Sequence, residues 1–168
     1  MAEYIQGVRA NGRGLKRGAT VQTSAGAGDA DKIPSLNSNG QLDPSMIPNL
    51  GILSLPANEA LAAGSYVNIF DSGGGVAEVR LADNSNGREA FGYVTAAVAA
   101  AATATVYTDD MNDGLTGLTP GLAYFLGTAG GVVPEASRPT AVNSLDQFIG
   151  YAVAADTIET EINDPVEL

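Results

Sequence analysis

The sequence of 168 residues contains no cysteine, no histidine and no tryptophan, and aromatic residues make up only 6% of it. Without cysteine the chain forms no disulfide, and without cysteine and histidine it lacks the usual ligands of zinc. The absence of histidine also excludes catalytic schemes in which an imidazole acts as the base. We therefore predict a protein that is not an enzyme, with no catalytic residues, no cofactor and no metal site.

Charged residues are also scarce, at 16%, and their signs are unevenly distributed. The formal net charge is −11, yet the first 28 residues hold four basic side chains against the single acid Glu3. The rest of the chain holds four basic and 18 acidic groups, so this acidic part repels nucleic acid and anionic membranes, and we expect neither as a partner. We expect the basic residues of the first segment to bind an acidic surface of another protein, and the alternative is a solvated, mobile N-terminus. These candidate residues are Arg9, Arg13, Lys16 and Arg17.

Long apolar segments are missing as well. The first 20 residues contain no apolar stretch of the kind found in a secretory signal. The longest uncharged run lies between Glu89 and Asp109 and consists mostly of alanine, threonine and glycine, which insert poorly into a bilayer. The sequence therefore predicts neither a secretory signal nor a transmembrane helix.

The N-terminal part of the chain divides into two segments of different composition. Residues 1–32 are rich in glycine, basic and without apolar periodicity, so we predict an extended N-terminal arm. Within this arm, β-branched residues favour a short strand at Ala19–Thr23. Residues 33–56 contain four prolines, which forbid long helices, and we predict that they form an extended connector.

Two local signals mark the connector. Asn39-Gly40 is a strong tight-turn signal, and Asp43–Met46 can begin one helical turn with Asp43 as its cap. Apolar side chains are dispersed along the segment, and such a segment gains stability mainly by lying on another surface, either the body domain or a partner. The candidate partner-binding residues of the connector are Ile33, Leu42, Met46 and Ile47.

Residues 57–168 are predicted to form one all-β domain, a small β-barrel or β-tulip-like sandwich, because strand candidates alternate with turn clusters rich in glycine, asparagine and aspartate. For Asn58–Ala63 we predict one or two helical turns, and for the alanine-rich run 96–104 a β-hairpin with a bend of small residues. The predicted strands are Tyr66–Phe70, Val76–Leu81, Phe91–Val98, Ala104–Thr108, Ala123–Leu126, Gly131–Val133, Phe148–Ala154 and Thr157–Ile162.

Two clusters were considered as chemical sites. The segment Asp71–Gly74 places a serine beside glycines, as serine proteases do, but the chain offers it no histidine, so a hairpin turn is the favoured interpretation. The segment Asp109–Asp113 is the densest acidic cluster. Its spacing does not match a helix-loop-helix calcium loop, since positions 3 and 12 would be Met111 and Pro120. A solvated loop is favoured there, and an irregular Ca²⁺ site built from loop carbonyls stays open.

Two segments resemble bacteriophage virion proteins. The segment Gly28–Pro48, GDADKIPSLNSNGQLDPSMIP, is similar to a segment that recurs in phage capsid cement proteins and tail fibres. The segment Leu115–Gly127, LTGLTPGLAYFLG, resembles an element of the same structural proteins. The strand candidates between them have a spacing similar to the small β-domain of head decoration proteins. The chain thus resembles the bacteriophage capsid cement, or head decoration, family.

This resemblance implies a structural protein that binds the outside of the assembled capsid and stabilises it, often as a trimer. The implied partners are the major capsid protein and further copies of the chain, and the implied location is the capsid exterior of the virion, after synthesis in the host cytoplasm. The alternative is a tail-fibre or baseplate component, which the short chain without a long fibrous repeat disfavours. A third class, a carbohydrate-active depolymerase, is disfavoured by the absence of histidine and tryptophan.

Overall fold

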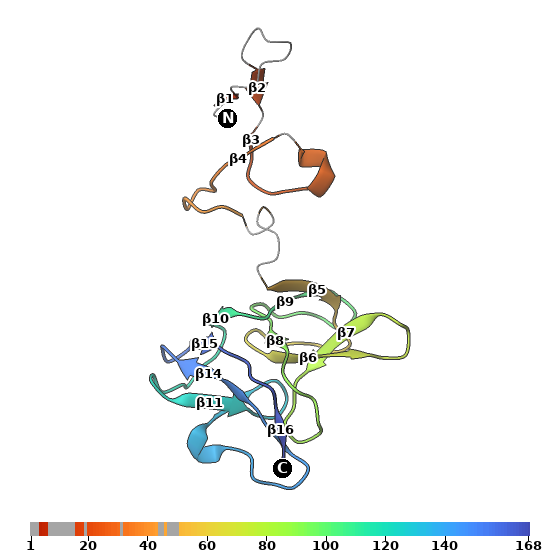
Figure 1. Cartoon of the computed structure of the whole chain (residues 1–168), viewed down its shortest axis with the longest axis vertical. Coiled ribbons are helices and arrows are strands. Elements are labelled where there is room, and N and C mark those ends of the chain that lie inside the picture. The colour runs from red at the N-terminus through yellow and green to blue at the C-terminus, as the bar shows by residue number, and fades with distance from the viewer. Residues whose placement is uncertain (1–3, 7–15, 19, 31, 44–45, 47–50) are drawn as a thin grey trace. The chain divides into compact units, whose positions relative to one another are not determined.

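The computed structural model divides the chain into two compact units, residues 1–50 and 51–168 (Figure 1). It describes residues 4–6, 16–18, 20–30, 32–43, 46 and 51–168. No α-helix is present in these residues. Beside the strands they include the short 3₁₀ helices η2 (Gly26–Asp29) and η4 (Glu135–Ser137) and the 3₁₀-helical residue Met46. The predicted all-β class is therefore confirmed.

The first unit contains two small pairs of strands. Strand β1 (Tyr4–Gln6) pairs antiparallel with β2 (Lys16–Gly18), and β3 (Thr20–Val21) pairs parallel with β4 (Ile33–Pro34). The strand predicted at Ala19–Thr23 is thus confirmed at its centre. None of the side chains described between residues 20 and 46 is buried, so this part of the unit has no core of its own.

The tight turn predicted at Asn39-Gly40 is confirmed. The Gly40 amide donates to the carbonyl of Asn37 at 3.0 Å, and the Asn37 amide donates to the carbonyl of Gln41 at 2.8 Å. Gly40 has a φ of 76°, a conformation that glycine adopts without the clash a Cβ would cause. The side-chain oxygen of Asn37 accepts from the amides of Asn39 and Gln41, which closes the loop from inside.

The second unit contains two five-stranded sheets and a small two-stranded one. We call the first sheet I, with the order β5-β9-β8-β6-β7, and the second sheet II, with the order β10-β15-β14-β11-β12. All neighbours within both sheets are antiparallel. The strands of sheet I are β5 (Ile52–Pro56), β6 (Tyr66–Asp71), β7 (Ala77–Leu81), β8 (Gly92–Tyr93) and β9 (Thr103–Tyr107). Those of sheet II are β10 (Asp110–Asn112), β11 (Ala123–Leu126), β12 (Val132–Pro134), β14 (Phe148–Ala152) and β15 (Ile158–Thr160), and the small sheet pairs β13 (Leu145–Asp146) with β16 (Val166–Glu167).

The predicted barrel is not confirmed, because both five-stranded sheets are open. Sheet I curls until its two edge strands approach each other, and an isolated bridge joins Ala57 to Val79. The amide of Asn58 donates to the carbonyl of Val79 there, at 2.8 Å. A continuous ladder does not form. Pro56 ends β5 and has no N–H to donate, so pairing between the edges is limited to the residues after it.

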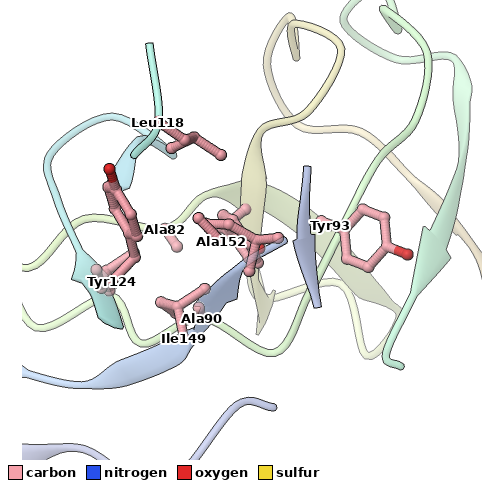
Figure 2. Packing of buried hydrophobic residues seen from close by; sticks show 10 residues of the cluster. Ala82, Ala90, Tyr93, Leu118, Tyr124, Ile149 and Ala152 are labelled. Atoms are coloured by element: carbon pink, nitrogen blue, oxygen red, sulfur yellow. The ribbon is translucent and has the colours of Figure 1, made fainter. Parts of the chain in front are cut away.

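Two hydrophobic clusters hold the second unit together. The first combines residues of both sheets, and Figure 2 shows Tyr93 of sheet I together with Tyr124 and Ile149 of sheet II among its members. The second lies on the other side of sheet I and contains mainly valine and alanine. Because β6 alternates, Tyr66 enters the first cluster and Val67 the second, so sheet I is buried on both faces.

The helical turns predicted at Asn58–Ala63 are wrong, because this segment is not helical. Leu61 and Val98 exchange backbone hydrogen bonds, each amide donating to the other carbonyl at 2.9 Å. Leu61 is 2% exposed and lies in the second cluster, so the gain from burying it outweighs the helix propensity of the neighbouring alanines.

The alanine-rich run departs in part from its prediction. Strands β8 and β9 do pair antiparallel, as a hairpin requires, but the ladder is limited to Tyr93 and Tyr107. Between them the chain leaves the sheet and turns back at Ala101, whose φ is 64°. The predicted strand Phe91–Val98 is therefore shortened to two residues, while strands β6, β7, β9 and β11 lie where the sequence places them.

Candidate functional site

The predicted partner-binding residues all lie in the first unit. Arg9, Arg13 and Ile47 fall outside the described residues. Lys16 and Arg17 belong to β2, in register with Gln6 and Ile5 of β1. This pairing places the two basic residues on a short hairpin.

The described apolar candidates of the connector are incompletely covered. Ile33 is half-buried in β4, in register with Thr20 of β3, so it is tied to the arm. Met46 is half-buried, and its amide donates to the carbonyl of Asp43 at 3.0 Å, which agrees with the predicted helical turn. Leu42 is 37% exposed and Leu36 is 57% exposed. The segment thus keeps apolar surface that its own unit does not bury.

Of the two chemical clusters, Asp71–Gly74 is a turn, whereas Asp109–Asp113 is not the solvated loop that we expected, because Asp110–Asn112 forms β10 and pairs with β15. The side-chain oxygen of Asp71 accepts from the amides of Gly73 and Gly75, and the Ser72 hydroxyl donates to Glu78 at 2.9 Å. The predicted hairpin turn between β6 and β7 is therefore confirmed. In the acidic cluster, Asp109 and Asp110 each accept from the amide of the next residue, at 2.8 Å. Within the described ranges, no group of three or more histidine, cysteine or acidic residues is arranged to hold a metal ion.

Buried polar side chains are used to join loops to the sheets. The Gln147 amide group accepts from the Ala90 amide and donates to the carbonyls of Ala90 and Asn163, at distances between 2.7 and 3.0 Å. The Asn112 side chain donates to the carbonyl of Gly64 at 2.9 Å. In the described part of the chain, no buried side-chain nitrogen or oxygen lacks a hydrogen-bond partner, so the buried polar groups stabilise the fold.

Two tyrosines lie in the core with a raised pKa. Burial raises the pKa of Tyr66, whose hydroxyl lies 3.3 Å from that of Thr160. Burial also raises the pKa of Tyr93, and the nearby charge of Asp110 adds to this effect. The Tyr93 hydroxyl donates to the carbonyl of Asp109 at 3.2 Å. Both phenols therefore stay protonated at neutral pH and serve as hydrogen-bonding members of the core.

A groove of about 450 Å³ borders β9 on the outside of sheet I. It is lined by alanine, threonine and valine side chains and by Tyr107, with no charged group. A second hollow, of about 320 Å³, is lined by Glu89, Phe91, Gln147 and Asp164 among others. The first is lined by no acidic or basic side chain, whereas the second contains the carboxylates of Glu89 and Asp164, and its Gln147 side chain is hydrogen-bonded to the backbone.

The outer face of sheet II is the most prominent surface that the sequence did not reveal. We use this name for the side chains that point away from the first cluster. Register places Met111, Glu159, Tyr151 and Ala123 in one row across β10, β15, β14 and β11. Their neighbours along each strand, such as Ile158 and Tyr124, point inward to the first cluster. The other members of the outer face are Phe125, Val133, Phe148, Val153 and Glu161.

A β-bulge gathers three aromatic rings on this face. The register between β11 and β14 shifts after Tyr124, which leaves Ile149 as the extra residue. Phe148 and Tyr151, three positions apart, therefore share the outer face instead of alternating. The Phe148 ring lies 5.2 Å from that of Tyr151 and 5.7 Å from that of Phe125, both edge to face.

Gly150 makes this bulge possible. Its φ is 154°, and a Cβ at this position would clash with the carbonyl oxygen of Glu159 on the neighbouring strand β15. A side chain there would push the two strands apart. The sequence Phe-Ile-Gly-Tyr at residues 148–151 is compatible with this bulge, but it predicts the bulge only once the pairing of β14 with β11 is known.

Opposite charges border the two sides of the outer face. On the β12 side, the Arg138 guanidinium lies over the Phe125 ring, 4.4 Å from its centre, and its Nε donates to Asp146 at 2.8 Å. The hydrogen bond to Asp146 raises the pKa of Arg138, which is charged at every relevant pH. The Arg138 side chain is 47% exposed, whereas that of Asp146 is 8% exposed. On the β15 side, Glu159 and Glu161 are exposed.

Comparisons with known proteins give little to add to this geometry. No protein-family model and no curated protein matches the chain. One similar solved structure is the crystal structure of the head fiber gp8.5 N base in bacteriophage phi29. It is 13% identical, with a TM-score of 0.44, and the match covers 67% of this chain and 92% of that one. Similarity at this level does not establish a shared fold, and the function proposed below does not rest on it.

Among the described residues, no helix has the length and apolar character needed to cross a bilayer.

Proposed function

We propose that this chain is a structural protein of a bacteriophage virion, which binds the outside of the assembled capsid and stabilises it. The observation that carries the proposal is the different fate of the two segments that resemble cement proteins. Most of Leu115–Gly127 is built into the fold of the second unit, whereas Gly28–Pro48 keeps exposed apolar side chains, Leu36 and Leu42 among them.

Most of the segment Leu115–Gly127 is explained by folding. Leu118 is 8% exposed in the first cluster, the Thr119 amide donates to the Tyr124 hydroxyl at 2.9 Å, and β11 lies at the end of the segment. Gly117 and Gly121 have φ values of 73° and 84° in the turns before the strand. Leu122 is 46% exposed, but the rest of the segment is built into the fold, so the segment mainly supports a shared architecture.

The segment Gly28–Pro48 is not explained in this way. None of its described side chains is buried, and Leu36 and Leu42 are exposed. Exposed apolar side chains in an extended segment lower the free energy when a partner covers them. Together with the basic residues before it, the segment has the composition expected for an arm that becomes ordered on a larger acidic surface.

The proposed partner is the major capsid protein, and the proposed location is the capsid exterior. We further propose that the chain acts as a homo-oligomer, with a trimer as the expected form, because several weak arms on one particle raise the effective affinity through multivalency. Such a protein works by contact alone, and we propose no enzymatic activity for it.

The direct test is binding to virus particles from which the protein has been removed. Deletion of residues 1–32 is expected to abolish binding while the circular dichroism and the unfolding transition of the second unit stay as in the full chain. A full chain with Leu36→Ser and Leu42→Ser should bind more weakly. The matched control Val142→Ser, which changes a side chain that is 80% exposed in the second unit, should bind as the unchanged protein does. Unchanged binding by the truncated chain would rule out the arm as the attachment element.

A tail-fibre or baseplate role is the second candidate, because both resembling segments also occur in tail fibres. Copy number separates the two. A capsid protein present at each symmetry position occurs in hundreds of copies per particle, whereas a tail component occurs in a few dozen or fewer. Quantitative mass spectrometry of purified virions measures this number directly.

A further inference from the structure

We propose that the outer face of sheet II binds the same face of a second copy of this chain, with Arg138 of one copy beside Glu159 and Glu161 of the other. The inference is independent of the capsid role, and it competes with the trimer proposed above, because a two-fold contact joins copies in pairs. It concerns a surface of the second unit that takes no part in the arm's proposed contact.

The outer face is apolar and partly open to solvent, since only Phe125, which lies beneath Arg138, is buried among its three aromatic rings. Tyr151 is 51% exposed, and Met111 and Val153 are each 47% exposed. An antiparallel sheet with one face in water usually alternates apolar residues inside with polar residues outside. On β14 the bulge works against this rule, because it adds Phe148 to the side that already holds Tyr151. A local irregularity that brings a second aromatic ring to the surface indicates that the surface has a partner.

Charge identifies the partner as a second copy. Residues 51–168 hold only three basic side chains against 15 acidic ones, so this unit repels copies of itself unless a basic group meets an acidic one. Two of the three lie outside the outer face. Arg80 lies over the Phe70 ring at 4.1 Å, and the Nη1 of Arg88 is 3.9 Å from Glu59. Arg138 is the third. It is paired with Asp146, but its side chain is 47% exposed and borders the aromatic rings of the outer face, so it can contact a second carboxylate as well.

The arrangement of charge on the face is self-complementary. Arg138 lies at the β12 side of sheet II, and Glu159 lies on β15, near the other edge. A two-fold axis in the plane of the interface and parallel to the strands places the β12 side of one copy over the β15 side of the other. Arg138 then meets Glu159 and Glu161 twice, as a symmetric interface requires. An axis across the strands would instead bring Glu159 against Glu159, which like-charge repulsion disfavours.

The rings occupy the middle of this interface. Phe148 and Tyr151 lie on β14, the central strand of sheet II, so the axis passes close to them. Aromatic side chains near the centre of an interface, surrounded by a polar rim, are the usual energetic hot spots. Arg138 is held in place by Asp146 and by Phe125, so little side-chain entropy is lost when it contacts a second copy.

Sedimentation of the full chain tests the surface. The unchanged protein is expected to self-associate reversibly as its concentration rises. Tyr151→Glu, which puts a further acid among the rings, should raise the dissociation constant by about tenfold or more. Glu159→Arg combined with Glu161→Arg should also weaken association, because Arg138 would then face like charge. Val142→Glu, outside the outer face, is the matched control and should leave the dissociation constant unchanged. Near-ultraviolet circular dichroism verifies that each variant is folded.

Disulfide trapping tests the orientation, and the chain suits it because it contains no cysteine. Glu159→Cys and Ser137→Cys, the latter beside Arg138, are made in separate full chains. On mild oxidation, a mixture of the two is expected to form the mixed disulfide in preference to either homodimer. A dominant homodimer of the Glu159→Cys chain would overturn the proposed axis. A monomeric unchanged protein at all concentrations would overturn the proposal, even where Tyr151→Glu impairs binding to capsids.

Discussion

The two units of this chain differ in how far they bury their apolar side chains. Residues 51–168 bury apolar side chains on both faces of sheet I and give every buried side-chain nitrogen and oxygen a hydrogen-bond partner. The described residues between 20 and 46 bury none, and their hydrogen bonds close local turns and short pairings. The second unit therefore has a core with which to fold alone, whereas the described residues between 20 and 46 have none.

The largest expected effect that sharpens this comparison is in the first cluster. Ile149 is fully buried between the two sheets, so Ile149→Ala removes apolar contacts and leaves a cavity. We expect a loss of about 2–5 kcal/mol in the free energy of unfolding, measured by urea denaturation. Leu36→Ala in the first unit is the matched truncation and should change this free energy by less than about 0.5 kcal/mol. Equal losses in both variants would mean that the first unit belongs to the same cooperative core.

A second comparison uses two glutamines that each donate to a backbone carbonyl. Gln147→Leu leaves the Ala90 amide and two carbonyls without the partner they have in the core, so we expect a loss of about 3 kcal/mol. Gln22 donates to the carbonyl of Leu36 at 3.0 Å in an exposed position, where water replaces the lost bond. Gln22→Leu should therefore be close to neutral. Thermal unfolding followed by circular dichroism measures both, and a stable Gln147→Leu variant would contradict the role given to this side chain.

The third comparison concerns glycine. Gly150→Ala places a methyl group against the Glu159 carbonyl and is expected to cost about 2 kcal/mol, since the strands must shift or the bulge must open. Gly28→Ala meets nothing within 4 Å and should leave the second unit unaffected. Amide exchange of β14 and β15 gives a local measure, because faster exchange there is expected in Gly150→Ala and not in the control.

The smallest effect is a pH dependence. Burial raises the pKa of Asp83, but hydrogen bonds from the Ser85 hydroxyl, the Ser85 amide and the Ala129 amide lower it more, so the net pKa is below 3.8. A lowered carboxyl pKa in the folded state adds stability above the unfolded value of 3.8, and this is lost as pH falls through the lower, folded one. Asp83→Asn should reduce stability by about 1 kcal/mol at pH 7 and flatten its fall in acid. An acid profile identical to that of the unchanged protein would contradict this assignment.

The strands could largely be predicted from the sequence because their signals are local. β-branched residues and turn clusters located β6, β7, β9 and β11 closely. Strand β5 was not predicted. It contains one proline and follows three further prolines, so the proline spacing led us to predict a connector for the whole segment. Its membership of sheet I depends on pairing with β9, more than forty residues away in sequence, and no local pattern contains that information.

The candidate surfaces also differ in whether local sequence patterns could predict them. The exposure of Leu36 and Leu42 could be anticipated from the proline spacing, because a segment that cannot form long helices buries few of its dispersed apolar side chains. The outer face of sheet II could not, because normal strand alternation would put Phe148 and Tyr151 on opposite sides. The bulge at Ile149 reverses this outcome, and it arises from the pairing of β11 with β14.

The stacked tyrosines of the second unit give the molecule an optical signal of its own. The ring centre of Tyr93 lies 5.9 Å from that of Tyr66 and 5.7 Å from that of Tyr107. The chain has no tryptophan, so tryptophan absorbance does not overlap the absorbance of these tyrosines. Since the pKa of Tyr66 and that of Tyr93 are both raised in the folded state, stability is fully present below pH 10 and declines as pH rises beyond it. Phenolate absorbance in an alkaline titration will therefore report the separation of the two sheets, without any dye or label.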